Sequence, residues 1–155
     1  MTDLNTMFPG RADYVGPTAG IFGLLHHDRL YEESHDVVQR VDYVRREKAA
    51  NEIAIRLHNM IYLGSCQAAV ECVALDANYA AAVAVLDADY AAAALAPLHA
   101  AYRVKRAQLH ARIVAYIKER IPDCAGNGRE LVFEGFQYTK ARTKACKYRA
   151  YTGSL

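Results

Sequence analysis

The chain has 155 residues, no Trp, four Phe, eleven Tyr and many Ala within a hydrophobic content of 53%. For this length we expect one domain rather than two, and alanine favours close helix packing over a thick core. The net charge of +2 indicates no particular partner, but residues 1–89 carry −6 and residues 90–155 carry +8. Such asymmetry predicts either an acidic helix folded back on a basic one or a basic end that meets an acidic partner.

Residues 1–20 predict an irregular N-terminal arm. They contain two prolines and three glycines and show no helical period. A terminal segment of this composition is ordered only when another part of a protein packs on it. We therefore expect this arm to reach a neighbouring chain.

Residues 28–95 predict one long helix or two helices. Proline is absent from 27–96, apolar residues recur at helical spacing, and Asp28 is the candidate N-cap. A continuous helix would be a rod of about 100 Å, which a compact domain of this size could not enclose. "YLGSCQ", which contains Gly64, is the best site for a break, although one glycine costs a helix only about 1 kcal/mol. Both arrangements stay open at this point.

A repeat of eleven residues ends this segment, in "LDANYAAAVAVLDADYAAAALA" at 75–96. Eleven residues make three turns at 3.67 residues per turn, so repeated side chains lie in a nearly straight stripe. The spacing returns after 97 with its register shifted by one residue. Large rings beside alanines are typical of closely packed helices. We expect a helix-packing stripe formed by Leu75, Tyr79, Leu86, Tyr90, Leu98, Tyr102, Leu109 and Ile113.

Pro97 interrupts the repeat and predicts either a kink or a corner. A proline inside a helix costs about 3 kcal/mol, whereas one in the first turn is tolerated. We therefore expect a second helix over about 98–121. A chain folded back at Pro97 would place Asp76 near Lys118, so the charges favour an antiparallel hairpin over a kinked rod.

Residues 122–155 predict a loop, a short strand and a basic tail. "RIPDCAGNGRE" is rich in turn residues, and "ELVFEGFQYT" after it is rich in β-forming ones. A lone strand is unstable, so we expect it to pair with the N-terminal arm or another subunit. The fold class is thus mainly α: an elongated helical hairpin or bundle at 21–121, flanked by the arm at 1–20 and by this extended basic segment.

Residues with metal-binding or nucleophilic chemistry form no complete set. Glu32-x-x-His35 has the helical carboxylate–histidine spacing of di-iron bundles, but the chain supplies no second pair, so a solvated helix face is the simpler interpretation. The four cysteines include no C-x-x-C pair, which predicts free thiols in a reducing compartment. We expect no catalytic residue, no metal ligand and no cofactor, and therefore no enzyme.

The sequence predicts neither a membrane span nor a secretory signal. Asp76, Asp87 and Asp89 interrupt the most apolar window, and the N-terminus lacks a basic start followed by an apolar core. We therefore expect a location in a virion or in the cytoplasm rather than secretion by a signal peptide.

The C-terminal tail alternates cations with tyrosines. Such a segment can neutralise phosphates while its rings stack on bases, which would bind DNA or RNA. It can equally dock on an acidic protein surface or only solubilise the chain. The second helix extends the basic area. The candidate contact residues are Lys140, Arg142, Lys144, Lys147, Arg149, Tyr138, Tyr148 and Tyr151, with Arg103 and Arg106 from the helix.

Long alanine-rich helices with terminal arms are typical of assembly proteins. We expect a non-enzymatic structural subunit that forms a homo-oligomer and contacts neighbouring assembly proteins, with a bacteriophage virion as the context suggested by architecture alone. One alternative is a nucleic-acid-binding helical accessory protein that uses the basic C-terminal half. A second alternative is a helical-bundle metalloprotein that uses Glu32 and His35.

Overall fold

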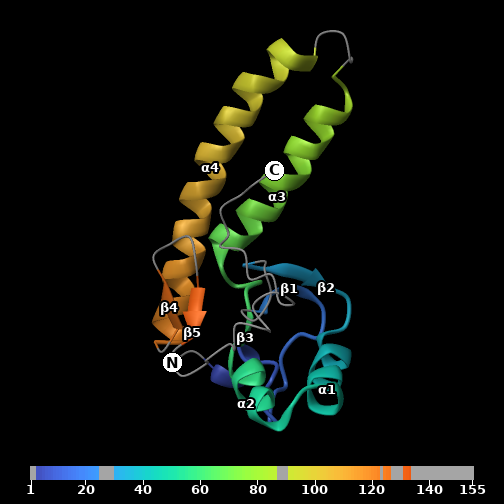
Figure 1. The fold of residues 1–155 in the computed structure, drawn as a ribbon, viewed down its shortest axis with the longest axis vertical. Helices are drawn as coiled ribbons and strands as arrows, with labels where there is room; N and C mark the ends of the chain where they lie inside the picture. The colour runs from blue at the N-terminus through green and yellow to red at the C-terminus, as the bar shows by residue number, and fades with distance from the viewer. Residues whose placement is uncertain (1–2, 25–29, 87–90, 123, 127–130, 134–155) are drawn as a thin grey trace.

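The computed structural model describes residues 3–24, 30–86, 91–122, 124–126 and 131–133. The mainly helical class is confirmed for these residues, which also form a small three-stranded antiparallel sheet (Figure 1). In chain order the elements are η1 (Leu4–Thr6), β1 (Gly20–Leu24), β2 (Glu32–Ser34), α1 (Val37–Glu47), α2 (Ala50–His58), β3 (Met60–Tyr62), α3 (Gln67–Ala84), α4 (Ala91–Arg120), β4 (Cys124–Gly126) and β5 (Leu131–Phe133).

The sheet joins three separate segments of the chain. β1 lies between β2 and β3 and pairs antiparallel with both, so that Phe22 is opposite Glu32 on one side and Tyr62 on the other. The fully buried Phe22 ring lies 5.4 Å from the Tyr62 ring. Val37 and Val41 of α1 pack in the same buried cluster as Phe22. The apolar face of α1 therefore anchors the sheet.

The expected helix over 28–95 is wrong, because this range holds β2, α1, α2, β3 and α3. Its candidate cap, Asp28, lies outside the described residues. The cap of α1 is Asp36, whose Oδ1 accepts hydrogen bonds from the backbone N–H groups of Val38 and Gln39 at 2.9 and 3.4 Å. α1 ends because Lys48 adopts an extended conformation. The helical periodicity is real, but it belongs to separate helices.

The break at Gly64, one of the two arrangements left open, is present. Met60–Tyr62 pairs with β1, and this long-range pairing overrides the local helical spacing. The chain then turns before α3, and an added Cβ at Gly64 would meet the Tyr62 ring. Glycine is therefore required by the close approach of this ring rather than by its own backbone angles.

α3 and α4 lie side by side and run in opposite directions (Figure 1). The expected second helix over 98–121 is wrong at its start, because α4 begins at Ala91 and continues through Pro97. The segment before Pro97 is almost entirely alanine, the best helix former. Ala93, whose carbonyl would accept the missing Pro97 N–H, is exposed, so water can replace that hydrogen bond. Pro97 is thus not the corner of the chain.

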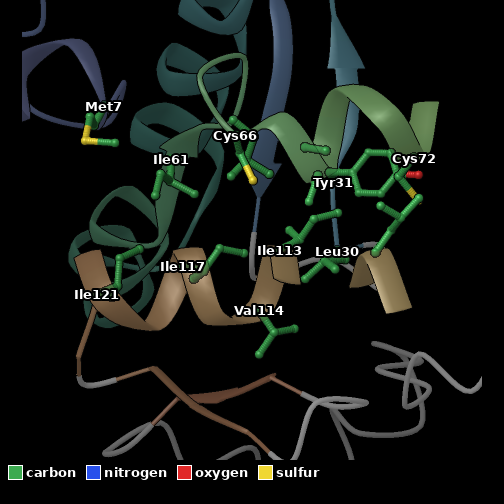
Figure 2. Close-up of a cluster of buried hydrophobic side chains, with 14 of the residues drawn as sticks. Met7, Leu30, Tyr31, Ile61, Cys66, Cys72, Ile113, Val114, Ile117 and Ile121 are labelled. Carbon is green, nitrogen blue, oxygen red and sulfur yellow. The ribbon is translucent and has the colours of Figure 1, made fainter. Parts of the chain in front are cut away.

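The N-terminal segment belongs to the protein's own core. Met7 and Phe8 are buried in one cluster with Ile113 and Ile117 of α4 and with Ile121 just after it, and Figure 2 shows Met7 and the three isoleucines there. The Met7 carbonyl also accepts a hydrogen bond from the Tyr62 backbone N–H. The segment is irregular apart from η1, as expected, but at Met7 and Phe8 it packs inward rather than on a neighbouring chain.

The strand expected after residue 130 pairs with neither partner that we proposed for it. β5 pairs antiparallel with β4, so that Val132 lies opposite Ala125. The further strand residues, Glu134, Phe136 and Tyr138, lie outside the described part of the chain. Across the described residues, no helix combines the length and the apolar character that a bilayer crossing needs.

Candidate functional site

Asp76 of α3 accepts side-chain hydrogen bonds from two other parts of the chain, α4 and the segment before β2. The Tyr102 hydroxyl and Arg106 Nε of α4 donate to its Oδ1 at 2.8 and 3.1 Å. The Tyr31 hydroxyl, from the segment before β2, donates to Oδ2 at 2.8 Å. The expected pairing of Asp76 with Lys118 is therefore wrong. We call Asp76, Tyr31, Tyr102 and Arg106 the Asp76 network.

Burial keeps both tyrosines of the Asp76 network protonated. Burial raises the pKa of the Tyr31 hydroxyl far above its usual value, and neighbouring Cys72 and Asp76 raise it further. Burial likewise raises the pKa of the Tyr102 hydroxyl, with the hydrogen bond to Asp76 as the next cause. Each hydroxyl therefore stays a donor to the carboxylate across the physiological range.

Two further titratable groups adjoin the network and are electrically neutral. Burial raises the pKa of the Cys72 thiol, which has no exposed surface. Burial, followed by the charge of Arg106, lowers the pKa of His110 to about 4. The His110 ring meets the Tyr31 ring edge-on at 6.1 Å. A protonated, buried thiol is a poor nucleophile, so this cluster is built for packing rather than for covalent chemistry.

Aromatic rings continue the contact between the helices beyond Asp76. The Tyr79 and Tyr102 rings stack with centroids 4.0 Å apart and planes 18° from parallel. The Tyr79 hydroxyl and His99 Nδ1 are 3.2 Å apart, within hydrogen-bond distance. Together with the Asp76 network, these contacts link one side of α3 to about two turns of α4, from His99 to Arg106. They fix the rotation and the register of the two helices relative to each other.

The register places the chain reversal well before Pro97. The ion pair of Asp76 with Arg106 joins residues that are equally far along the sequence from residue 91. The Glu71 carboxylate lies 3.3 Å from Arg112, and this pair has nearly the same midpoint in the sequence. The expected corner at residue 97 would have shifted every cross-helix pair by about twelve residues. Acidic residues of α3 do face basic residues of α4, so the charge argument was sound and only its register was wrong.

The side of α3 opposite the Asp76 network is apolar and exposed. Cys72, Asp76 and Tyr79 face α4, and residues two positions away point about 200° from them. Val and Ala predominate on this opposite side, with the polar Gln67 and Asn78 beside them. We call this surface the α3 outer face: Val70, Ala74, Ala77, Ala81 and Val85, all exposed.

α4 repeats this arrangement on its own far side. Tyr102, Leu109 and Ile113 point inward and are buried. Apolar residues at alternating spacings of four and three lie opposite them, and Val104 among them is 60% exposed. We call this surface the α4 outer face: Ala93, Pro97, Ala100, Val104, Ala107 and Ala111, all exposed.

The expected packing stripe lies on the inner faces of the two helices. Tyr102, Leu109 and Ile113 are buried in the structure, and Tyr90 lies outside the described residues. The partly buried members are Leu75, Tyr79, Leu86 and Leu98. The eleven-residue repeat is thus used between α3 and α4 of one chain.

The ten candidate contact residues for nucleic acid are not brought together among the described residues. Arg103 is exposed on α4, whereas Arg106 is partly buried and held by Asp76. The other eight, at 138–151, lie outside the described part of the chain. Lys105 of the same helix is also exposed.

The carboxylate–histidine pair does not have the helical geometry that its spacing suggests. Glu32 lies in β2, not in a helix, and its Oε1 is 3.2 Å from the Arg40 guanidinium. In the described ranges no group of three or more His, Cys, Asp or Glu side chains could hold a metal ion. Glu32 therefore acts as an ion-pair partner that joins β2 to α1.

Sequence reasoning missed both outer faces and the role of Asp76. The outer faces carry a signal, because Val70, Ala74, Ala77 and Ala81 repeat at helical spacing as clearly as the inner tyrosines do. Helix α3 is apolar on both sides, which is typical of a helix covered on both sides. Asp76 was visible as an isolated carboxylate in an apolar segment, but its partners come from distant parts of the chain.

Comparison with known proteins gives no relative: no protein-family model, no curated protein and no solved structure matches the chain.

Proposed function

We propose that this protein is a non-enzymatic structural subunit that assembles with copies of itself through the hairpin formed by α3 and α4. The observation that carries the proposal is that both helices, already packed against each other, present apolar outer faces to solvent. A helix in a monomer normally turns charged residues outward. Apolar faces on both sides of one hairpin are instead typical of a surface that other chains cover.

The side chains on these faces suit helix-to-helix contact. Alanine lets two helices approach to about 8 Å, the short end of the usual range. Val85 and Val104 are 82% and 60% exposed, and burying a valine stabilises a contact by about 1.5 kcal/mol. Several such residues at regular spacing would give a continuous seam rather than an isolated point of contact.

The hairpin is also stiff enough to serve as an assembly element. The Asp76 network and the Tyr79–Tyr102 stack join its helices by directional contacts, not by apolar packing alone. A preorganised surface loses less conformational entropy on association than a mobile one. Neighbouring assembly proteins, for example in a bacteriophage virion, are further partners in this proposal.

The test is sedimentation velocity of the full-length protein from about 1 to 100 μM. We expect wild type to form oligomers whose population grows with concentration. Val85→Glu combined with Val104→Glu should give a monomer with unchanged helical content. Val15→Glu is the matched control, because Val15 is 78% exposed but lies outside the hairpin. A wild-type monomer throughout this range would refute the proposal.

A second candidate function, binding of nucleic acid, rests on the exposed cations Arg103 and Lys105 of α4. Each of these exposed cations can contact a phosphate, and the basic tail would add to them. This proposal predicts that a labelled oligonucleotide binds at 50 mM salt and is released at 200 mM. Truncation after Thr139 should abolish that binding, whereas the oligomers of the first proposal should persist in both salts.

A further inference from the structure

The α3 outer face has an order of residues that reads the same in both directions. Val70 and Val85 stand at its ends, and Ala74 and Ala81 stand inside them. Both pairs share one midpoint, which falls between Ala77 and Asn78. All of these side chains are exposed, so none of them is needed for packing within the chain.

This order has a direct geometric consequence for contact between two copies. When two identical helices pack antiparallel about a twofold axis, a residue before the midpoint meets the one equally far beyond it. An axis at the midpoint of α3 would therefore bring Val70 to Val85, Ala74 to Ala81 and Ala77 to Asn78 of the other copy. Binding to a different protein would not require a symmetric order of residues.

Charge favours the same arrangement. Between Val70 and Val85 the charged residues are Glu71, which pairs with Arg112, and Asp76, which points to α4 and is engaged by Tyr102 and Arg106. Two α3 outer faces can therefore meet without repulsion. The α4 outer face is different, because Arg103 and Lys105 flank Val104 and would approach their own copies in a symmetric contact.

We propose that α3 of one chain packs antiparallel on α3 of a second copy, with the twofold axis beside Ala77 and Asn78. This inference rests on the proposed function and names one of its interfaces. Val70 of each chain then packs on Val85 of the other, and the two Asn78 amides lie near the axis. A polar pair at that position fixes the register of the two helices.

The size of the seam sets the strength of the dimer. Fifteen residue steps from Val70 to Val85 span about 22 Å of helix. Two helices in contact over that length bury less than the standard interface of about 1,600 Å². We therefore expect a dimer that dissociates in the micromolar range.

The test is cysteine cross-linking of the full-length protein under mild oxidation. A disulfide needs Cα atoms within about 7 Å, so a cysteine beside the axis can pair with its own copy. Ala77→Cys should form a covalent dimer by itself. Val70→Cys and Val85→Cys should each stay monomeric alone and give a dimer only when mixed. Ala111→Cys on the α4 outer face is the matched control. Wild type is the second control, because it shows how much cross-linking the native cysteines cause by themselves.

A charge on the seam gives the second arm of the test. Ala81→Glu should raise the dissociation constant at least 100-fold in sedimentation, with unchanged helical content. If oligomers persist in Ala81→Glu and Ala77→Cys forms no disulfide, the α3 seam is refuted while the proposed assembly function stands. If wild type is monomeric at all concentrations and no variant cross-links, both are refuted.

Discussion

Tyr102 of α4 donates a 2.8 Å hydrogen bond to Asp76 of α3, and its ring stacks on Tyr79 one turn further along α3. One side chain thus sets both the spacing and the register of the two helices. Arg106 adds a charged hydrogen bond to the same carboxylate oxygen. The order of the hairpin therefore depends on one acidic residue.

Replacing Asp76 with Ala should strongly destabilise the protein. Tyr31, Tyr102 and Arg106 would lose the carboxylate that accepts their hydrogen bonds, and the partly buried Arg106 would lose its ion pair with Asp76. We expect the free energy of unfolding to fall by about 3 kcal/mol, measured by urea denaturation. Asp76→Asn should lose less, because an amide oxygen can still accept.

The matched control for this prediction is Asp13→Ala. Asp13 pairs with Arg11 within an exposed segment, and such pairs contribute little to stability. Equal losses in Asp76→Ala and Asp13→Ala would contradict the role that we assign to the network.

Stability should fall as the pH is lowered from about 6.5 to 4, because His110 is buried in its neutral form. Its pKa is about 4 in the folded protein and 6.5 in the unfolded chain, so the unfolded chain binds more protons over this window. The folded His110 faces Arg106, Asp76 and Tyr31. The loss attributable to this residue should approach about 3 kcal/mol at pH 4.

Urea denaturation at pH 7, 5.5 and 4.5 measures this effect as the difference between wild type and His110→Leu. The variant should show the shallower dependence on pH. His35→Gln, which removes an exposed histidine, is the control. Parallel curves for wild type and His110→Leu would show that His110 is accessible to protons in the folded state.

Gly10→Ala should loosen the N-terminal segment from the core. A Cβ at Gly10 would collide with the backbone of Leu57 in α2, which cannot rotate away. We expect a loss of about 2 kcal/mol in the free energy of unfolding. Gly16→Ala is the matched control, because the atoms nearest to its Cβ would belong to the Tyr14 side chain rather than to backbone. Similar stabilities of the two variants would mean that residues around Gly10 are not docked.

Pro97→Ala should stabilise the protein. Pro97 is exposed, so its ring makes no core contact, and alanine would restore a backbone N–H donor in the second turn of α4. We expect a gain of about 1 kcal/mol, reduced from the full cost of an interior proline by the proximity of the helix start. Ala100→Gly in the same helix should lose about 1 kcal/mol. A melting temperature lowered by Pro97→Ala would instead indicate a corner at this residue.

Local signals in the sequence predicted the helical class, the end of α4 near residue 121 and a strand after residue 130, but not the three-stranded sheet, nor β4 within the expected loop. Met60–Tyr62 continues an apolar pattern that fits a helix equally well, and only its pairing with β1 makes it a strand. Phe22, its partner, lies some forty residues earlier. Pairing at that separation leaves no mark on local periodicity, so the break at Gly64 was visible as an alternative and the strand was not.

The position of the chain reversal was missed for a different reason. Pro97 is the strongest local break signal in its region, but the alanines before it have high helix propensity and Ala93 is exposed. Hydrogen bonding and stacking around Asp76 then determine the register. The eleven-residue repeat predicted which residues lie on one stripe. The exposure of the residues opposite the stripe could not be predicted without knowing which side of α3 is covered by α4.

The burial of Met7 beside Ile121 has a consequence for synthesis of the chain on the ribosome. α3 and α4 are adjacent in sequence, so their local contacts can form early and quickly. The main cluster, however, includes residues from both ends of the helical region, so it cannot close until the end of α4 has left the exit tunnel. During that interval Met7 and Phe8 stay exposed on the nascent chain, where a chaperone could bind them.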